Sequence, residues 1–256
     1  IRNKYNAGCA VGILNAPDAT DNPETDEKIP YRYGPDNHWE MKRLDKLALQ
    51  KALGLEENAD APLFFWPSRL DPVQKGPQLL TDITFKFLDK YAKEGAQIAV
   101  IANGAYQKPF RDIQALHGLS KRLAVHDFDG RLSQLGFAAS DFMLMPSLFE
   151  PCGLPQMQAP IYGSLAVVHN TGGLHDTVEP LDWEKSTGNG FRFDTYDSNG
   201  LFWAMDQMEF FRQPREIRER EVARIMRESI KRFSHEACAK EYIKLYEKML
   251  DRPLVK

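Results

Sequence analysis

The sequence contains 256 residues, in which 33 Lys and Arg nearly balance 36 Asp and Glu and give a formal net charge of -3. This balance offers no broad cationic surface for a nucleic acid or an anionic membrane, and 43% hydrophobic with 27% charged residues argues against disorder. No apolar run approaches the roughly 18 residues that a membrane helix needs, and the first residues do not resemble a signal peptide. We therefore expect neither a nucleic-acid nor a membrane partner.

The three cysteines, Cys9, Cys152 and Cys238, are far apart and form no C-x-x-C pair, so the sequence predicts neither a disulfide framework nor a zinc site. A reducing compartment fits this pattern, and we expect a cytoplasmic protein, or a plastid one if the source is a plant. Because the chain begins with Ile rather than Met, we treat it as part of a longer protein.

Residues 1–38 hold a short apolar stretch at residues 10–14, followed by a polar run rich in Asp, Asn and Pro. This pattern predicts an entry strand and a long surface loop. From Trp39 to Leu53, leucines spaced among Lys, Arg and Asp predict an amphipathic helix, and Gly54 stands where a C-terminal cap is expected.

We predict a domain at residues 39–196. It contains five short apolar runs that do not alternate with polar residues. Such runs are typical of strands buried on both faces. They are residues 63–66, 98–101, 123–125, 142–145 and 165–168. Helix-length stretches such as residues 77–93 and 154–162 lie between them, so the sequence predicts an α/β, Rossmann-like domain with a doubly wound parallel sheet. In such sheets ligands bind at the carboxyl ends of the strands.

The remaining segment, residues 197–256, is rich in Glu, Arg, Lys, Met and aromatic residues and predicts two or three helices. Pro214 interrupts it, and residues 233–236 offer a second helix start. We interpret the mixed Arg and Glu residues of 215–232 as a solvated face rather than a ligand site. An apolar stripe lies near the end of the chain: Tyr242, Leu245, Tyr246 and Met249.

The loop after the first run of the regular region carries two cations, Arg69 and Lys75, on either side of a tight turn. Gly76 and Pro77 then open the next helix. Both cations could therefore meet a diphosphate near a helix N-terminus. A surface Arg and Lys in an exposed turn is the alternative.

Glu150 follows the run at residues 142–145, and Gly153 follows it in the same loop. A carboxylate in this position can accept hydrogen bonds from sugar hydroxyls, while glycine allows close approach of the backbone. The alternative role for Glu150 is to cap a helix. We interpret Cys152 as a small packed residue rather than a nucleophile, because no His lies within a few positions.

The third loop reads Thr171-Gly172-Gly173 and joins a predicted strand to a predicted helix. Backbone N–H groups at the positive end of a helix suit a phosphate, and Thr171 adds a hydroxyl. A simple turn would also explain the two glycines.

Three strings in these loops resemble the glycogen and starch synthase family. They are Ser68-Arg-Leu with Gln74-Lys75-Gly76, then Phe149-Glu-Pro-Cys-Gly-Leu154, then Thr171-Gly-Gly-Leu-x-Asp-Thr-Val178. The resemblance covers most of residues 10–195. It implies a retaining glucosyltransferase of the two-Rossmann-domain (GT-B) architecture, of which this chain is the C-terminal half. The last helices would then pack on the domain and reach towards the N-terminal half.

The resemblance also implies roles for individual residues. Arg69 and Lys75 would neutralise the departing diphosphate of ADP-glucose or UDP-glucose, and Glu150 would hold glucose hydroxyls, as the catalytic set. Phe128 would stack on the base, and Asn15 matches the Asn of the family's Leu-Asn-Gly turn. The implied donor-binding set is Asn15, Phe128, Cys152, Gly153, Leu154, Thr171, Gly172 and Gly173.

By the same resemblance, the 4-hydroxyl of an α-1,4-glucan acceptor attacks on the face that the diphosphate leaves, so no second catalytic carboxylate is required. The string Asp127-Phe128-Asp129 looks like the metal-binding Asp-x-Asp of another glycosyltransferase architecture. Since it sits among GT-B strings, we expect no metal and no other cofactor. The isolated fragment should bind nucleotide weakly and transfer little or nothing.

The chain departs from the family pattern at Ala16-Pro17, Leu148 and His169-Asn170, and each change removes flexibility or positive charge. Donor preference or activity could differ as a result. One alternative is a sucrose- or lipid-sugar-type GT-B transferase, although Gln158 stands where those enzymes usually carry a second Glu. Another is a non-catalytic nucleotide-sugar-binding module. A dinucleotide oxidoreductase is disfavoured because no Gly-x-Gly-x-x-Gly follows the first strand of the regular region.

Overall fold

The computed structural model describes residues 2–251 and contains one six-stranded sheet in the order β3-β2-β1-β4-β5-β6. All five strand pairs are parallel. The strands are β1 (Leu63–Trp66), β2 (Gln97–Ile101), β3 (Leu123–His126), β4 (Phe142–Met145), β5 (Leu165–His169) and β6 (Gly190–Phe193). The prediction of a Rossmann-like, doubly wound parallel sheet is confirmed, and β6 is an addition to the five predicted strands.

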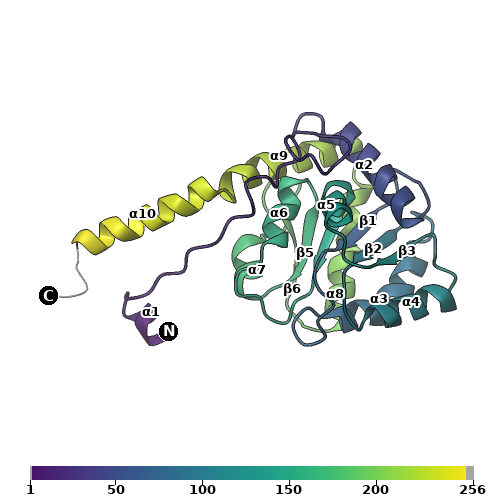
Figure 1. The fold of residues 1–256 in the computed structure, drawn as a ribbon, viewed down its shortest axis with the longest axis horizontal. Helices are drawn as coiled ribbons and strands as arrows, with labels where there is room; N and C mark the ends of the chain where they lie inside the picture. Colours follow the sequence, from purple (N-terminus) through teal and green to yellow (C-terminus); the bar gives the residue numbers. More distant parts are fainter. Residues whose placement is uncertain (1, 252–256) are drawn as a thin grey trace.

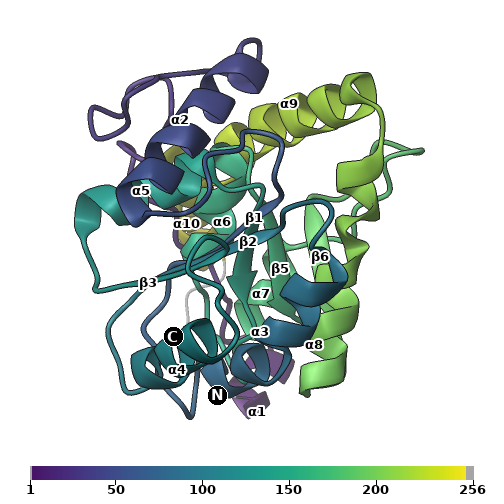
Figure 2. The same cartoon turned by 90° about the vertical axis from the view of Figure 1, so that its right-hand side faces the viewer.

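Helices cover both faces of the sheet (Figures 1 and 2). The helices are α1 (Arg2–Asn6), α2 (His38–Leu53), α3 (Pro77–Lys90), α4 (Gln107–Leu116), α5 (Gly130–Ala139), α6 (Pro155–Ile161), α7 (Gly172–Thr177), α8 (Ser198–Met205), the 3-10 helix η1 (Asp206–Arg212), α9 (Arg215–Arg232) and α10 (His235–Asp251). One hydrophobic cluster joins the sheet to α3, α4 and α8, and a second joins it to α2, α5, α6 and α9.

Strand β1 shows why the apolar runs do not alternate. Phe64 packs edge-on against Phe87 of α3, with ring centroids 5.1 Å apart, while Phe65 packs against Phe137 of α5 at 5.3 Å. Consecutive side chains of a strand point to opposite faces, and here both faces are covered. Every residue of β1 is buried as a result.

Local signals fix the helix ends close to their predicted positions. Gly54 caps α2 in the left-handed conformation, with φ of 71°. Gly76 has the same φ of 71° at the start of α3. Pro77 follows as the first helical residue, a position where the backbone N–H that proline lacks would make no hydrogen bond within the helix. Asp129 caps α5 by accepting hydrogen bonds from the backbone of Arg131 and Leu132.

The predicted entry strand at residues 10–14 is wrong. These residues form an irregular segment that leaves the domain alongside α10 (Figure 1). Val11 is 56% and Leu14 38% exposed, and no strand of the described residues lies beside them to share backbone hydrogen bonds. An apolar run does not form a strand without such a partner.

The loop between residues 17 and 37 is held to the domain by buried polar contacts. The hydroxyl of Tyr33 donates to the carbonyl oxygens of Ala138 and Tyr162, over 3.0 and 2.9 Å. The hydroxyl of Tyr162 in turn donates to Asp26 over 2.7 Å. The long surface loop is therefore anchored over α5 and α6.

The C-terminal helices divide into two kinds. Leu201 of α8 and Ile225 of α9 are fully buried in the first core cluster, and Met226 of α9 is fully buried in the second, so these helices complete the domain. The interpretation of residues 215–232 as a solvated face is wrong in part, because Glu221 on α9 is fully buried with Arg224 paired to it. Helix α10 buries none of its described side chains and extends away from the domain (Figure 1). Over residues 2–251, no helix has the length and apolar character to cross a membrane.

Candidate donor site

Three loops meet at the carboxyl edge of the sheet, after β1, β4 and β5. The backbone N–H of Leu148 donates to the carbonyl of Gln74 over 2.8 Å, which joins the first loop to the second. The backbone N–H of Gly173 donates to the carbonyl of Glu150 over 2.9 Å, which joins the second loop to the third. The loops that the sequence picked out separately therefore form one continuous surface.

An ion pair lies at the centre of this surface. The ammonium of Lys75 contacts a carboxylate oxygen of Glu150 at 2.5 Å, and the two side chains are only 12% and 9% exposed. The hydroxyl of Ser147 donates to the same carboxylate oxygen over 3.4 Å. Glu150 does not cap a helix, since its carboxylate faces Lys75 and α6 begins beyond it at Pro155. Two opposite charges attract each other more strongly when little water surrounds them than when both are exposed.

The glycines of this surface are required by close backbone packing. A β-carbon on Gly172 would lie 2.1 Å from the carbonyl oxygen of Glu150, and one on Gly173 would lie 2.0 Å from that of Cys152. Gly76 is similarly placed, because its β-carbon would lie 2.3 Å from the carbonyl oxygen of Pro146. Any larger residue would force the loops apart. This constraint acts between protein segments, whatever ligand the loops bind.

The remaining residues of the second loop face outward or support it. Leu154 is 44% exposed, and Gly153 takes a left-handed φ of 75° just before α6. Cys152 is half-buried, is not in a disulfide, and packs against the core cluster that contains α5 and α6. Its packing agrees with the interpretation as a small structural residue.

Arg69 and Phe128 lie on the loops after β1 and β3, which flank the loop after β2. Arg69 is exposed and makes no hydrogen bond or ion pair with any other described residue, while Phe128 is 58% exposed. Asn103, after β2, connects their loops: its side-chain oxygen accepts from the N–H of Phe128 at 2.9 Å, and its carbonyl accepts from that of Leu70 at 3.1 Å. Asn103 was not predicted from the sequence, although an amide side chain just after a buried strand was a usable signal.

Asn15 is not brought to these loops. It lines a groove with Arg232, Ser234 and Glu241, where the N-terminal segment runs beside the start of α10. The turn at Asn15, which matches the family's Leu-Asn-Gly turn, therefore lies apart from the loops after β1, β4 and β5 in this structure. Thr171, by contrast, precedes α7 directly and its side chain makes no capping hydrogen bond.

The unusual pair His169 and Asn170 has local partners. The ring of His169 lies 2.8 Å from the carbonyl oxygen of Ser147, so its Nδ1 carries the proton and donates. The amide of Asn170 donates to Asp194 over 2.6 Å, and its oxygen lies 2.7 Å from Nδ1 of His175. Both residues tie β5 to its neighbours.

The two aspartates of the Asp127-Phe128-Asp129 string have separate structural contacts. Asp129 caps α5, and Asp127 accepts from the amide of Gln107 at 2.7 Å. Within the described residues, no group of three His, Cys, Asp or Glu side chains is placed to hold a metal ion.

Comparison with known proteins identifies the family. The model of the family described as "Glycosyl transferases group 1" matches residues 51–220, which is most of the chain and includes all three loops. The chain belongs to this glycosyltransferase family. Its loops are therefore the carboxyl-edge loops of a glycosyltransferase domain.

Relatives of this glycosyltransferase domain include glycogen synthases. The enzyme of Thermosipho melanesiensis is 37% identical over 246 residues, covering 94% of this chain and 49% of the relative. That of Thermotoga maritima is 38% identical over 243 residues, covering 93% and 48%. The chain thus spans about half the length of the curated relatives that it matches. The resemblance to glycogen and starch synthases is confirmed.

Solved structures show the same relationship. The catalytic domain of starch synthase IV from Arabidopsis thaliana, bound to ADP and acarbose, superposes with a TM-score of 0.81 at 29% identity, over 97% of this chain and 51% of that one. The Anabaena protein HepE in complex with UDP gives a TM-score of 0.61 at 20% identity, over 84% and 56%, and shares the fold alone. The domain is therefore one half of a GT-B architecture.

Proposed function

We propose that this chain is the donor-binding half of a glycogen or starch synthase-type glucosyltransferase, which transfers glucose with retention from ADP-glucose or UDP-glucose to the 4-hydroxyl end of an α-1,4-glucan. The shielded pair of Lys75 and Glu150, at the carboxyl edge of a nucleotide-binding fold, carries this proposal. The ADP in the starch synthase structure supports it, because that protein has the most similar fold among those described above.

Lys75 would act on the leaving group. As the bond between the anomeric carbon and the diphosphate oxygen breaks, negative charge grows on that oxygen, and a preorganised ammonium stabilises the transition state more than the ground state. Arg69, free of partners among the described residues and exposed on the same loop, supplies a guanidinium for the same diphosphate. The acceptor oxygen forms the new bond on the same face and its proton passes to the departing diphosphate, so the step needs no second carboxylate.

Glu150 would orient the sugar. Its carboxylate has two oxygens, and the described contacts from Lys75 and Ser147 both reach Oε2. The other oxygen, Oε1, can accept a hydrogen bond from a glucose hydroxyl. The ion pair with Lys75 holds the carboxylate in place before the donor arrives, which reduces the cost of ordering it on binding. The proposed chemistry uses no metal ion.

Calorimetric titration of the full-length protein with ADP and with UDP tests this assignment, with EDTA present throughout. We expect one nucleotide to bind more tightly and Lys75→Met to weaken that binding. Exposed Lys108, which among the described residues pairs with Asp112 on α4, provides a control in Lys108→Met. Equal binding by all three proteins, or binding that EDTA abolishes, would contradict the proposal.

A further inference from the structure

A concave site lies at the opposite edge of the sheet from the donor loops. It is bounded by α2, η1 and α9, and by the amino ends of β4 and β5 at Asp141 and Leu165. Its cavity volume is about 60 Å³. One water needs roughly 10–15 Å³ on this measure, so the pocket accommodates a small molecule and is too small for a nucleotide. None of its lining residues belongs to the donor loops.

Arg218 of α9 has an unsatisfied charge in this pocket. Its guanidinium lies 4.8 Å from the ring centre of Trp39 and 4.5 Å from that of Phe211. Its Nε is buried without a hydrogen-bond partner, and the side chain makes no ion pair with another described residue. Burial lowers the pKa of Arg218. Arg218 as a whole is half-buried, but its Nε has lost water without gaining a hydrogen bond, which is costly, and an anion in the pocket would offset that cost.

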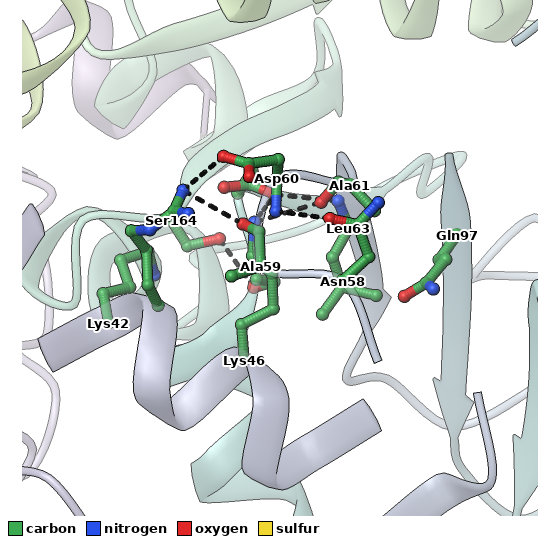
Figure 3. Close-up of polar contacts among 12 residues, drawn as sticks. Lys42, Lys46, Asn58, Ala59, Asp60, Ala61, Leu63, Gln97 and Ser164 are labelled. Atoms are coloured by element: carbon green, nitrogen blue, oxygen red, sulfur yellow. Dashed lines mark hydrogen bonds and ion pairs between the residues drawn. The ribbon is translucent and has the colours of Figure 1, made fainter. Parts of the chain in front are cut away.

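The neighbouring carboxylates are already paired with other cations. Lys46 contacts Asp141 at 2.7 Å, and Arg43 contacts Asp60 at 2.6 Å. Figure 3 shows Lys46 on α2 near the loop that carries Asp60. Lys42, also on α2, lines the pocket as well and donates to backbone carbonyls. The lining thus holds four basic side chains against one carboxylate, that of Asp141, and burial lowers the pKa of one of the four, Lys42, to about 7.

His38 adds an acceptor to the pocket. Its Nδ1 lies 2.9 Å from the carbonyl oxygen of Pro35 and therefore carries the proton. Burial lowers the pKa of His38, which keeps the ring neutral and leaves Nε2 as a lone-pair acceptor. The side chain is 3% exposed, and Nε2 has no partner among the described residues. A ligand hydroxyl would satisfy it.

We propose that this pocket binds a small hydroxylated organic anion, whose carboxylate or phosphate pairs with Arg218, whose hydroxyl donates to His38, and whose short carbon body packs against the apolar part of the lining, which includes Phe210 and Val222. The carboxylate and phosphate forms share this chemistry. Strand β4, whose four residues span about 13 Å, separates this site from the loop that carries Glu150.

Calorimetry on the full-length protein, at saturating ADP so that the donor site is filled, tests the proposal. The probes are glycerol 3-phosphate, 3-hydroxybutyrate and, lacking the hydroxyl, butyrate. We expect one hydroxylated probe to bind with 1:1 stoichiometry and butyrate to bind at least tenfold more weakly than 3-hydroxybutyrate. Arg218→Met should weaken binding at least tenfold. Arg227→Met on the same helix, whose side chain is 51% exposed, should leave it within twofold.

Two further variants decide the remaining outcomes. Ala59→Phe fills the pocket from its loop while keeping every charge, and it should abolish binding even if Arg218→Met fails to fold, as thermal melting would show. Lys75→Met should leave probe binding unchanged. The proposal is overturned if no hydroxylated probe binds, if Ala59→Phe binds as tightly as the parent, or if Lys75→Met abolishes binding, which would place the anion at the donor loops.

Discussion

Replacing Lys75 with Met removes the ammonium while keeping most of the length of the side chain. Glu150, whose side chain is 9% exposed, would then keep its charge with only Ser147 as a side-chain partner. Removing one member of a fully buried pair costs about 3–5 kcal/mol. Because this pair sits at the surface end of the loops, we expect a smaller loss of unfolding free energy, about 1–3 kcal/mol.

The catalytic effect of the same change should be separable from its effect on stability. We expect Lys75→Met to lower kcat/KM by about 10²-fold or more, equivalent to about 3 kcal/mol of transition-state stabilisation. Glu150→Gln alone should also reduce both activity and stability. In the double variant no buried charge is left unpaired, so stability should recover by roughly 0.5–3 kcal/mol relative to additivity, while activity should not recover.

The assay is urea unfolding and steady-state glucose transfer on the parent, both single variants and the double variant of the full-length protein. Our reasoning would be refuted if activity recovered in the double variant together with stability, because the two residues would then act only by holding the loops. A Lys75→Met enzyme within threefold of the parent would remove Lys75 from the mechanism.

Three further perturbations test other parts of the structure. Gly173→Ala should destabilise the protein by about 1–3 kcal/mol and weaken nucleotide binding, because the new β-carbon would lie 2.0 Å from a carbonyl oxygen. The control is Gly130→Ala, whose β-carbon would have no neighbour within 4 Å and which should cost less than about 0.5 kcal/mol in thermal melts. Equal costs for the two variants would contradict the packing argument. Tyr33→Phe should cost about 0.5–1.5 kcal/mol in urea unfolding because two buried carbonyls each lose one donor and keep Lys42 as the other, whereas Tyr31→Phe, at a 42% exposed position, should be neutral. Burial raises the pKa of Asp45 to about 7. The folded state therefore binds more protons than the unfolded state between about pH 4 and 7, so stability attributable to Asp45 falls as pH rises through that window. Between pH 4.5 and 8, the free energy of unfolding of Asp45→Asn should rise relative to that of the parent by about 1 kcal/mol or more. Parallel curves of unfolding free energy against pH would show that folding does not shift the pKa of Asp45.

The sheet was predictable from the sequence because its strands are buried on both faces. Runs such as Phe142–Met145 are apolar throughout, and this pattern can be recognised from the sequence without knowing which elements pack against the strand. Strand β6 was missed because Gly190 and Arg192 interrupt its apolar character, and it forms by pairing with β5. The strand prediction for residues 10–14 was wrong for the opposite reason. These residues have the composition of a strand, but no strand of the described residues lies beside them to share backbone hydrogen bonds.

The candidate site was predictable as three loops but not as one surface. Each loop follows a recognisable strand, and parallel strands place their carboxyl ends at one edge. The contact between Lys75 and Glu150, and the need for glycine at 172 and 173, depend on distances between loops that no local pattern contains. The pocket at Arg218 was hidden for a similar reason, because a helix rich in Arg and Glu resembles a solvated face until its neighbours are known.

The most direct test of the proposed function is transfer of labelled glucose from ADP-glucose and from UDP-glucose onto glycogen, by the full-length protein and its Glu150→Ala variant. We predict incorporation that prefers one donor and collapses in the variant. No incorporation from either donor, with ADP still bound in calorimetry, would contradict the synthase assignment and favour a non-catalytic nucleotide-sugar-binding module or a different sugar donor.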